Sequence, residues 1–168
     1  MGRLLEAGAF GVVVPHIRTA QQAEAIAQAC RYPPRGKRSS GTTRALTWGM
    51  DYRSWINGEV VVIPQIEDRE GIENADGIMA FEDIDIGFLG PNDLALDLEV
   101  SAGRPEHEEA MQTFLTACQS VDKPCGLPVP SANALRQRVK QGFSFFDLSS
   151  DFAFLRDEAQ SQLAEARE

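Results

Sequence analysis

Short runs of apolar residues, mostly β-branched or aromatic, recur along the chain and alternate with longer segments in which apolar residues repeat at helical spacing. Such runs are typical of strands that are buried on both faces of a parallel sheet. We expect strands at residues 9–15, 60–66, 85–89, 124–129 and 143–148. Strands that alternate with helices in this way predict right-handed βαβ units and a parallel sheet.

The segments between the strands carry recognisable helix signals. Thr19 and Gln22 have capping-box spacing, and Ser131 and Gly142 mark the start and the end of another helix. Ser149 or Ser150 opens the last helix. The residues expected to face inward from that helix are Phe152, Leu155 and Leu163.

Two architectures share this alternation, the open doubly wound sheet and the (β/α)₈ barrel. An open dinucleotide-binding sheet should carry a G-x-G-x-x-G turn after its first strand, and this sequence has none. A barrel of roughly 250 residues uses about 31 per βα unit. Residues 1–168 would therefore form a single, partial α/β domain: about the last five βα units of a (β/α)₈ TIM barrel.

Charge and composition exclude several classes of function. The net charge of −9, from 16 Lys and Arg against 25 Asp and Glu, disfavours nucleic acid as a partner. The apolar runs are far shorter than the roughly 20 residues that a membrane helix needs. The three cysteines lack C-x-x-C spacing and indicate buried free thiols. We therefore expect a cytoplasmic protein.

Polar residues at two strand ends are candidates for chemistry. Gln65 and Glu67 stand at the carboxyl end of a strand whose other residues are apolar, where parallel folds place their sites. The alternative for Glu67 is a cap on the following helix. Gly90, Asn92 and Asp93 lie beyond the next strand, in a turn that can approach a ligand closely. The alternative for Asp93 is an ordinary helix N-cap.

The two acids together predict more than either alone. If the strands at 60–66 and 85–89 are neighbours, they lie about 4.8 Å apart, and Glu67 and Asp93 can converge on one point. Two carboxylates completed by water and substrate oxygens are a usual arrangement for Mg²⁺. Such an ion polarises a carbonyl and stabilises an enolate oxygen.

A basic segment and two histidines are less specific signals. The cations between Arg31 and Arg38 are interpreted either as a loop that draws anionic substrates to the site mouth or as a solvated loop. His16 follows the first strand, where a role in the site is an open alternative. His107 is expected at the surface.

Four segments carry a family resemblance: GAFGVVVPHI, RYPPRGKRS, VVVIPQIE and GFLGPNDLALD. In this order and spacing the chain resembles the HpcH/HpaI aldolase/citrate lyase family, metal-dependent enzymes that make or cleave bonds to the pyruvate enolate. The motifs VPHI and IPQIE look most like its macrophomate synthase branch. The resemblance runs from about residue 4 to the last helix.

The resemblance implies that Glu67 and Asp93 hold Mg²⁺, or Mn²⁺ or Co²⁺ in its place. It implies that Gln65 touches the pyruvyl unit and that the backbone around Gly90 and Asn92 receives its carboxylate. Glu6 falls where relatives often have an Asp that supports the catalytic base, and is our candidate catalytic residue. The family usually assembles as a hexamer with its last helix exchanged, so a homo-oligomer is expected.

The family's acid/base histidine and enolate-stabilising arginine lie in about three further upstream units. Neither maps onto this sequence, and we expect the sequence to be a truncated one. The leading hypothesis is a metal-dependent carbon–carbon lyase, an aldolase, that acts on small 2-oxo acids such as 4-hydroxy-2-oxo acids or oxaloacetate. The alternatives are a catalytically inactive scaffold that binds metal and 2-oxo acid, and a decarboxylating enzyme of the macrophomate synthase type that forms carbon–carbon bonds.

Overall fold

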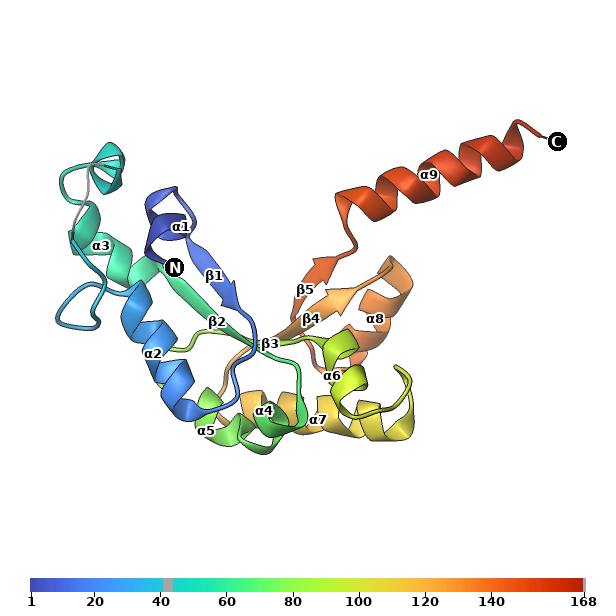
Figure 1. The fold of residues 1–168 in the computed structure, drawn as a ribbon, viewed down its shortest axis with the longest axis horizontal. Coiled ribbons are helices and arrows are strands. Elements are labelled where there is room, and N and C mark those ends of the chain that lie inside the picture. The colour runs from blue at the N-terminus through green and yellow to red at the C-terminus, as the bar shows by residue number, and fades with distance from the viewer. Residues whose placement is uncertain (41–43, 168) are drawn as a thin grey trace.

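A computed structural model describes residues 1–40 and 44–167. In that part of the chain five parallel strands form one sheet, ordered as they occur in the sequence. The strands are Gly11–Val14 (β1), Val61–Ile66 (β2), Gly87–Leu89 (β3), Cys125–Val129 (β4) and Phe145–Leu148 (β5). All of the expected strands are present. The sheet curls with its helices as part of a (β/α)₈ barrel does (Figure 1), which confirms the predicted fold class.

Helices connect the strands, and most of them lie on the outer face of the sheet, although the last extends away from it (Figure 1). They are Gly2–Glu6 (α1), Ala20–Cys30 (α2), Tyr52–Glu59 (α3), Arg69–Glu73 (α4), Ala75–Met79 (α5), Pro91–Asp97 (α6), Pro105–Ser120 (α7), Ala132–Gln141 (α8) and Asp151–Glu165 (α9), with a 3₁₀ turn at Ala45–Trp48 (η1). No helix among the residues described is long and apolar enough to cross a membrane.

Local signals in the sequence fix where the helices begin and end. The hydroxyl of Thr19 accepts a hydrogen bond from the Gln22 N–H at 3.2 Å, and the Gln22 side chain accepts one from the Thr19 N–H, so the predicted capping box is present. Ser131 caps α8, and Gly142 ends it in the left-handed conformation with φ of 112°. These boundaries follow from hydrogen bonds between close neighbours in the sequence.

The core lies between the sheet and its covering helices. On α7 the residues Met111, Phe114, Leu115 and Cys118 are fully or almost fully buried. The three cysteines are buried free thiols, as expected. His107 lies on the same helix face with 2% exposure, so its expected surface position is wrong. Its ring is satisfied internally: Nδ1 accepts from the Gly103 N–H at 3.2 Å, and Nε2 lies 2.8 Å from the Pro91 carbonyl oxygen.

The last helix departs from the sequence expectation. α9 extends away from the sheet (Figure 1) and carries no buried residue. Phe152, Leu155 and Leu163, expected to face inward, are 69%, 72% and 58% exposed. The cap itself is as predicted, because the Ser150 hydroxyl accepts from the Ala153 N–H at 3.1 Å. The apolar residues therefore have no packing surface within the described part of the chain.

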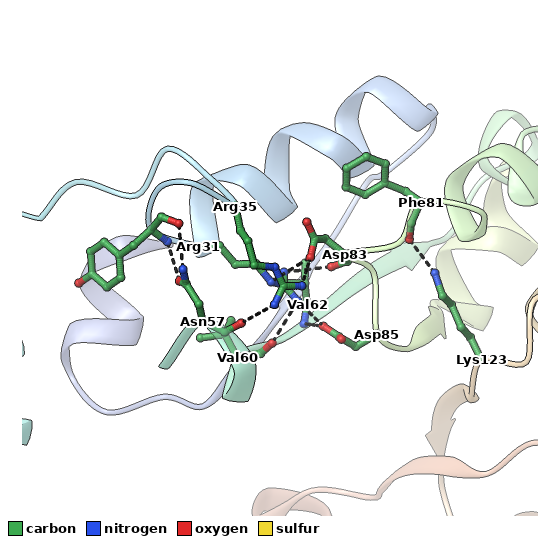
Figure 2. Close-up of polar contacts among 10 residues, drawn as sticks. Arg31, Arg35, Asn57, Val60, Val62, Phe81, Asp83, Asp85 and Lys123 are labelled. Atoms are coloured by element: carbon green, nitrogen blue, oxygen red, sulfur yellow. Dashed lines mark hydrogen bonds and ion pairs between the residues drawn. The ribbon is translucent and has the colours of Figure 1, made fainter. Parts of the chain in front are cut away.

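A polar network lies at the amino edge of the sheet, where the strands begin (Figure 2). Arg31, only 2% exposed, donates to the Val60 and Asp83 carbonyl oxygens and to the Asp85 carboxylate, while Arg35 pairs with Asp83. The proposed role of this basic segment at the site mouth is therefore wrong for these two arginines. The physical reason is topological: the connection from a helix to the next parallel strand lies at the edge opposite the strand ends.

Candidate active site

The strand ends of β1, β2 and β3 are held together at the carboxyl edge, the edge where the strands finish. The Ile17 N–H donates to the Gln65 carbonyl oxygen at 3.2 Å, which continues the pairing of β1 with β2. The Gly90 N–H donates to the Ile66 carbonyl oxygen at 2.9 Å, which does the same for β3. Three turns that are distant in sequence thus meet around the residue that follows β2.

That residue is Glu67, whose side chain is almost completely buried at this edge. It is 3% exposed, and three donors reach it. The backbone N–H and Nδ1 of His16 both approach Oε1, at 2.8 and 2.9 Å. Gln65 Nε2 donates to Oε2 at 2.5 Å. The alternative of Glu67 as a helix cap is excluded, because Asp68 caps α4 by accepting from the Gly71 N–H.

Glycine is required at position 90 by the close approach of the backbone to this carboxylate. A Cβ atom there would lie 2.6 Å from Glu67 Oε2 and 2.9 Å from Gln65 Nε2. Such distances are well inside van der Waals contact, so any larger residue would displace the Glu67 side chain. The close backbone approach that we expected at Gly90 is therefore made to the side chain of Glu67.

Asp93 stands three residues further on, in the first turn of α6. It is exposed, and within the described residues it makes no hydrogen bond or ion pair. The alternative of Asp93 as the helix cap is wrong, because Gly90 occupies the N-cap position. Glu67 and Asp93 both belong to the carboxyl edge, and their joint hold on a cation stays a prediction.

The sequence left open whether His16 has a role in the site, and the structure places it in contact with Glu67. Its backbone lies in the left-handed region, with φ of 58°, and this turns both its N–H and its ring toward Glu67. The available signal was the position of His16 just beyond a strand end, next to another strand that ends in an acid.

Two other candidates are placed differently. Asn92 is exposed in the first turn of α6, beside the same edge. Glu6 ends α1, before β1 starts, and its carbonyl oxygen accepts from Trp48 Nε1. Figure 1 shows α1 at the start of the β1 arrow, away from the strand ends. The catalytic role of Glu6 stays a prediction.

A cavity of about 610 Å³ lies on the other side of α6. Pro91, Asn92 and Val129 line it together with the buried His107 and the pair Glu108–Arg138. Its lining does not include Gln65, Glu67 or Asp93. Asn92 therefore lines this cavity, whereas Gln65 and Glu67 lie outside it.

The donor set at the carboxyl edge limits which metal it suits. Within residues 1–40 and 44–167 no three His, Cys, Asp or Glu side chains gather as a metal-ligand group. This excludes a closed zinc-type site built from the described side chains. Two carboxylates at one edge are hard oxygen donors, and they suit an ion such as Mg²⁺, which keeps several waters and uses one or two carboxylates.

Comparison with known proteins identifies the family. The family model described as HpcH/HpaI aldolase/citrate lyase matches residues 1–157. The chain therefore belongs to the HpcH/HpaI aldolase/citrate lyase family, and the predicted resemblance is confirmed.

Relatives in this family are named aldolases. A hydroxypyruvate/pyruvate aldolase of Rhizorhabdus wittichii is 35% identical over 98% of this chain and 68% of the relative. A 5-keto-4-deoxy-D-glucarate aldolase of Citrobacter koseri is 33% identical over 98% of this chain and 65% of the relative. The chain thus spans about two thirds of these proteins, and their names are consistent with a carbon–carbon lyase.

Solved structures agree with this fold. An HpcH/HpaI family protein from Burkholderia cenocepacia superimposes with a TM-score of 0.94 at 31% identity, over 99% of this chain and 68% of the other. Macrophomate synthase superimposes with a TM-score of 0.86 at 29% identity, over 97% of this chain and 60% of the other. The partial-barrel architecture is therefore that of the family.

Proposed function

We propose that this chain carries the metal and pyruvyl half of a divalent-metal-dependent carbon–carbon lyase that acts on 2-oxo acids. The observation that supports the proposal is the Glu67 carboxylate, buried at the carboxyl edge and oriented by three donors. A carboxylate at this depth needs a positive or donating partner for each oxygen. The hydrogen bonds supply part of this, and a cation shared with Asp93 completes it.

In the proposed mechanism the residues of the chain bind and orient the substrate. Glu67 and Asp93 hold the cation, and Gln65, beside Glu67, contacts the pyruvyl unit. The backbone around Gly90 and Asn92 receives the substrate's C1 carboxylate through the Asn92 N–H, because the first N–H groups of a helix have no partner within the helix, whereas the Gly90 N–H is already bound to the Ile66 carbonyl oxygen. When bound, a divalent cation stabilises negative charge on the substrate's C2 oxygen as a Lewis acid.

The proposed substrates are 4-hydroxy-2-oxo acids and oxaloacetate, cleaved to release pyruvate. The chemistry needs a base, which we do not assign among the described residues. A decarboxylating, bond-forming reaction of the macrophomate synthase type uses the same arrangement. The proposed assembly is a homo-oligomer, in which α9 would find a surface for its exposed apolar residues.

The test is metal-dependent pyruvate release, measured with and without EDTA, together with Mn²⁺ binding by titration calorimetry. We expect EDTA to abolish release, and we expect Glu67→Gln and Asp93→Asn to weaken Mn²⁺ binding and turnover at least about 100-fold, since a Lewis acid contributes several kcal/mol. Asp122→Asn is the control, because Asp122 is an exposed acid in the turn between α7 and β4.

Each outcome decides between the alternatives. Mn²⁺ binding without pyruvate release supports the inactive scaffold in place of the enzyme. Mn²⁺ affinity that Glu67→Gln and Asp93→Asn both leave unchanged contradicts the metal site itself.

A further inference from the structure

Both bonds to one oxygen of Glu67 come from the same residue. His16 supplies its backbone N–H at 2.8 Å and its ring Nδ1 at 2.9 Å, and both reach Oε1. A carboxylate oxygen has about two lone-pair positions. His16 therefore contacts Oε1 twice, by a backbone hydrogen bond and by its ring nitrogen at ion-pair distance.

The other oxygen of Glu67, Oε2, differs from Oε1 in how many donors contact it and in which residues lie beside it. Among the described residues Oε2 accepts only from Gln65 Nε2, and it retains one lone-pair position. It is also the oxygen nearest to Gly90, since a Cβ at that residue would lie 2.6 Å from it. Oε2 thus faces the turn that leads into the helix bearing Asp93.

We propose that His16 is a positioning residue that reserves Oε2 of Glu67 for the divalent cation and imposes binding through that single oxygen. This inference rests on the proposed function, because it presumes a cation at Glu67. Without the ring of His16, Oε1 keeps only the backbone N–H of residue 16, and the orientation of the carboxylate is less firmly fixed. The cation then loses a fixed ligand, although Glu67 itself is unchanged.

The left-handed backbone of His16 allows substitutions that remove the ring and keep the backbone conformation. Its φ of 58° lies in the left-handed region, which glycine adopts freely and asparagine adopts more readily than most residues. His16→Gly removes the ring but keeps the backbone donor. His16→Asn also keeps that donor, and its amide nitrogen stands close to where the ring carries Nδ1. Asp122→Gly is the matched control, since Asp122 is exposed and has φ of 55°.

The experiment is Mn²⁺ titration calorimetry on the four chains, with circular dichroism to confirm that each is folded. We expect His16→Gly to lower Mn²⁺ affinity about 10- to 100-fold, the usual cost of losing a group that orients a metal ligand. We expect His16→Asn to restore most of the loss and Asp122→Gly to change nothing. Rescue by asparagine is the result that a merely structural role for the ring would not produce.

The outcomes separate this inference from the proposed function. Equal Mn²⁺ affinity in the natural chain and in folded His16→Gly overturns the inference alone. An affinity loss that His16→Asn does not restore also overturns it, because the Nδ1 contact is then irrelevant. A natural chain that binds no Mn²⁺ overturns the proposed function together with the inference.

Discussion

The two edges of the sheet use charged residues in opposite ways. At the amino edge, Arg31 is almost completely buried and is paired with Asp83 and Asp85 (Figure 2). At the carboxyl edge, Glu67 is equally buried, but it contacts no Lys or Arg side chain among the described residues, and the His16 N–H, the Gln65 amide and His16 Nδ1 reach it instead. One edge pairs its buried arginine with two carboxylates, and the other holds the Glu67 carboxylate without a lysine or arginine partner in the described part of the chain.

The amino edge therefore stabilises the fold, and the carboxyl edge is where the chain is able to bind a ligand. Lys123 reinforces the amino edge by donating to the Met79 and Phe81 carbonyl oxygens (Figure 2). Mutations at the amino edge should therefore change the free energy of unfolding, while mutations at the carboxyl edge should change ligand affinity. The predictions below test that division.

The largest effect is expected from Arg31→Met. Removing this side chain takes the arginine donor from two carbonyl oxygens and leaves the Asp85 carboxylate with the Val62 N–H alone. We expect a loss of about 3–5 kcal/mol in the free energy of unfolding, measured by urea titration, as for other broken buried pairs. Mn²⁺ affinity of the folded protein should not change.

Arg35→Met is the matched comparison for this prediction. Arg35 also pairs with Asp83, but its side chain is 46% exposed. Exposed pairs contribute at most about 1 kcal/mol. Equal losses in the two variants would contradict the view that burial of Arg31 gives the amino edge its strength.

The next effect is expected from Gly90→Ala. The added methyl would collide with the Glu67 side chain, and overpacking of this kind costs about 1–3 kcal/mol. Because the collision is with Glu67, Mn²⁺ affinity should fall as well. Both are measured on the same protein, by urea unfolding and by calorimetry.

Gly77→Ala controls for the loss of a glycine. Gly77 lies inside α5, and a Cβ there would find its nearest neighbour at an ordinary 3.7 Å. The variant should be as stable as the natural chain or up to about 1 kcal/mol more stable. An unchanged Mn²⁺ affinity in Gly90→Ala would show that the close approach does not matter for binding.

The smallest effect is a pH dependence at the cavity beside α6. Arg138 donates to both carboxylate oxygens of Glu108, at 2.6 and 2.8 Å, and this lowers the pKa of Glu108. A lowered acid pKa contributes stability above the unfolded-state value of about 4.3, and that stability is lost as the pH falls through the folded-state pKa.

Urea unfolding of the natural chain and Glu108→Gln between pH 7 and pH 3 tests this sign. The natural chain should be more stable by less than about 1 kcal/mol at neutral pH, since the pair is partly exposed. The difference should shrink below about pH 4.3. A difference that grows in acid would mean that Arg138 is not the cause of the lowered pKa.

Much of the fold follows from the sequence because its signals are local. The apolar runs predict all five strands within one or two residues, and Thr19, Ser131 and Ser150 cap helices as expected. The prediction fails where packing between elements that are distant in the sequence determines whether a residue is buried. His107 continues the buried face of α7, yet its burial depends on acceptors and donors at Pro91 and Gly103.

The site is predictable only in part, for the same reason. Gln65, Glu67 and Gly90 follow strand ends, and parallel pairing alone brings such residues to one edge. The contact of His16 with Glu67 depends additionally on the exact pairing of β1 with β2 and on a left-handed backbone. Neither can be deduced from the pattern of apolar residues.

The order of the strands has a consequence for how the molecule assembles. Each strand pairs with the strand that precedes it in the chain, so no pairing has to wait for a segment synthesised much later. One βα unit separates the paired residues, for example Gly11 and Val61 or Gly126 and Phe145, so each pairing closes a single connection. The sheet can therefore grow one strand at a time as the polypeptide leaves the ribosome, each new unit adding to an edge that is already in place.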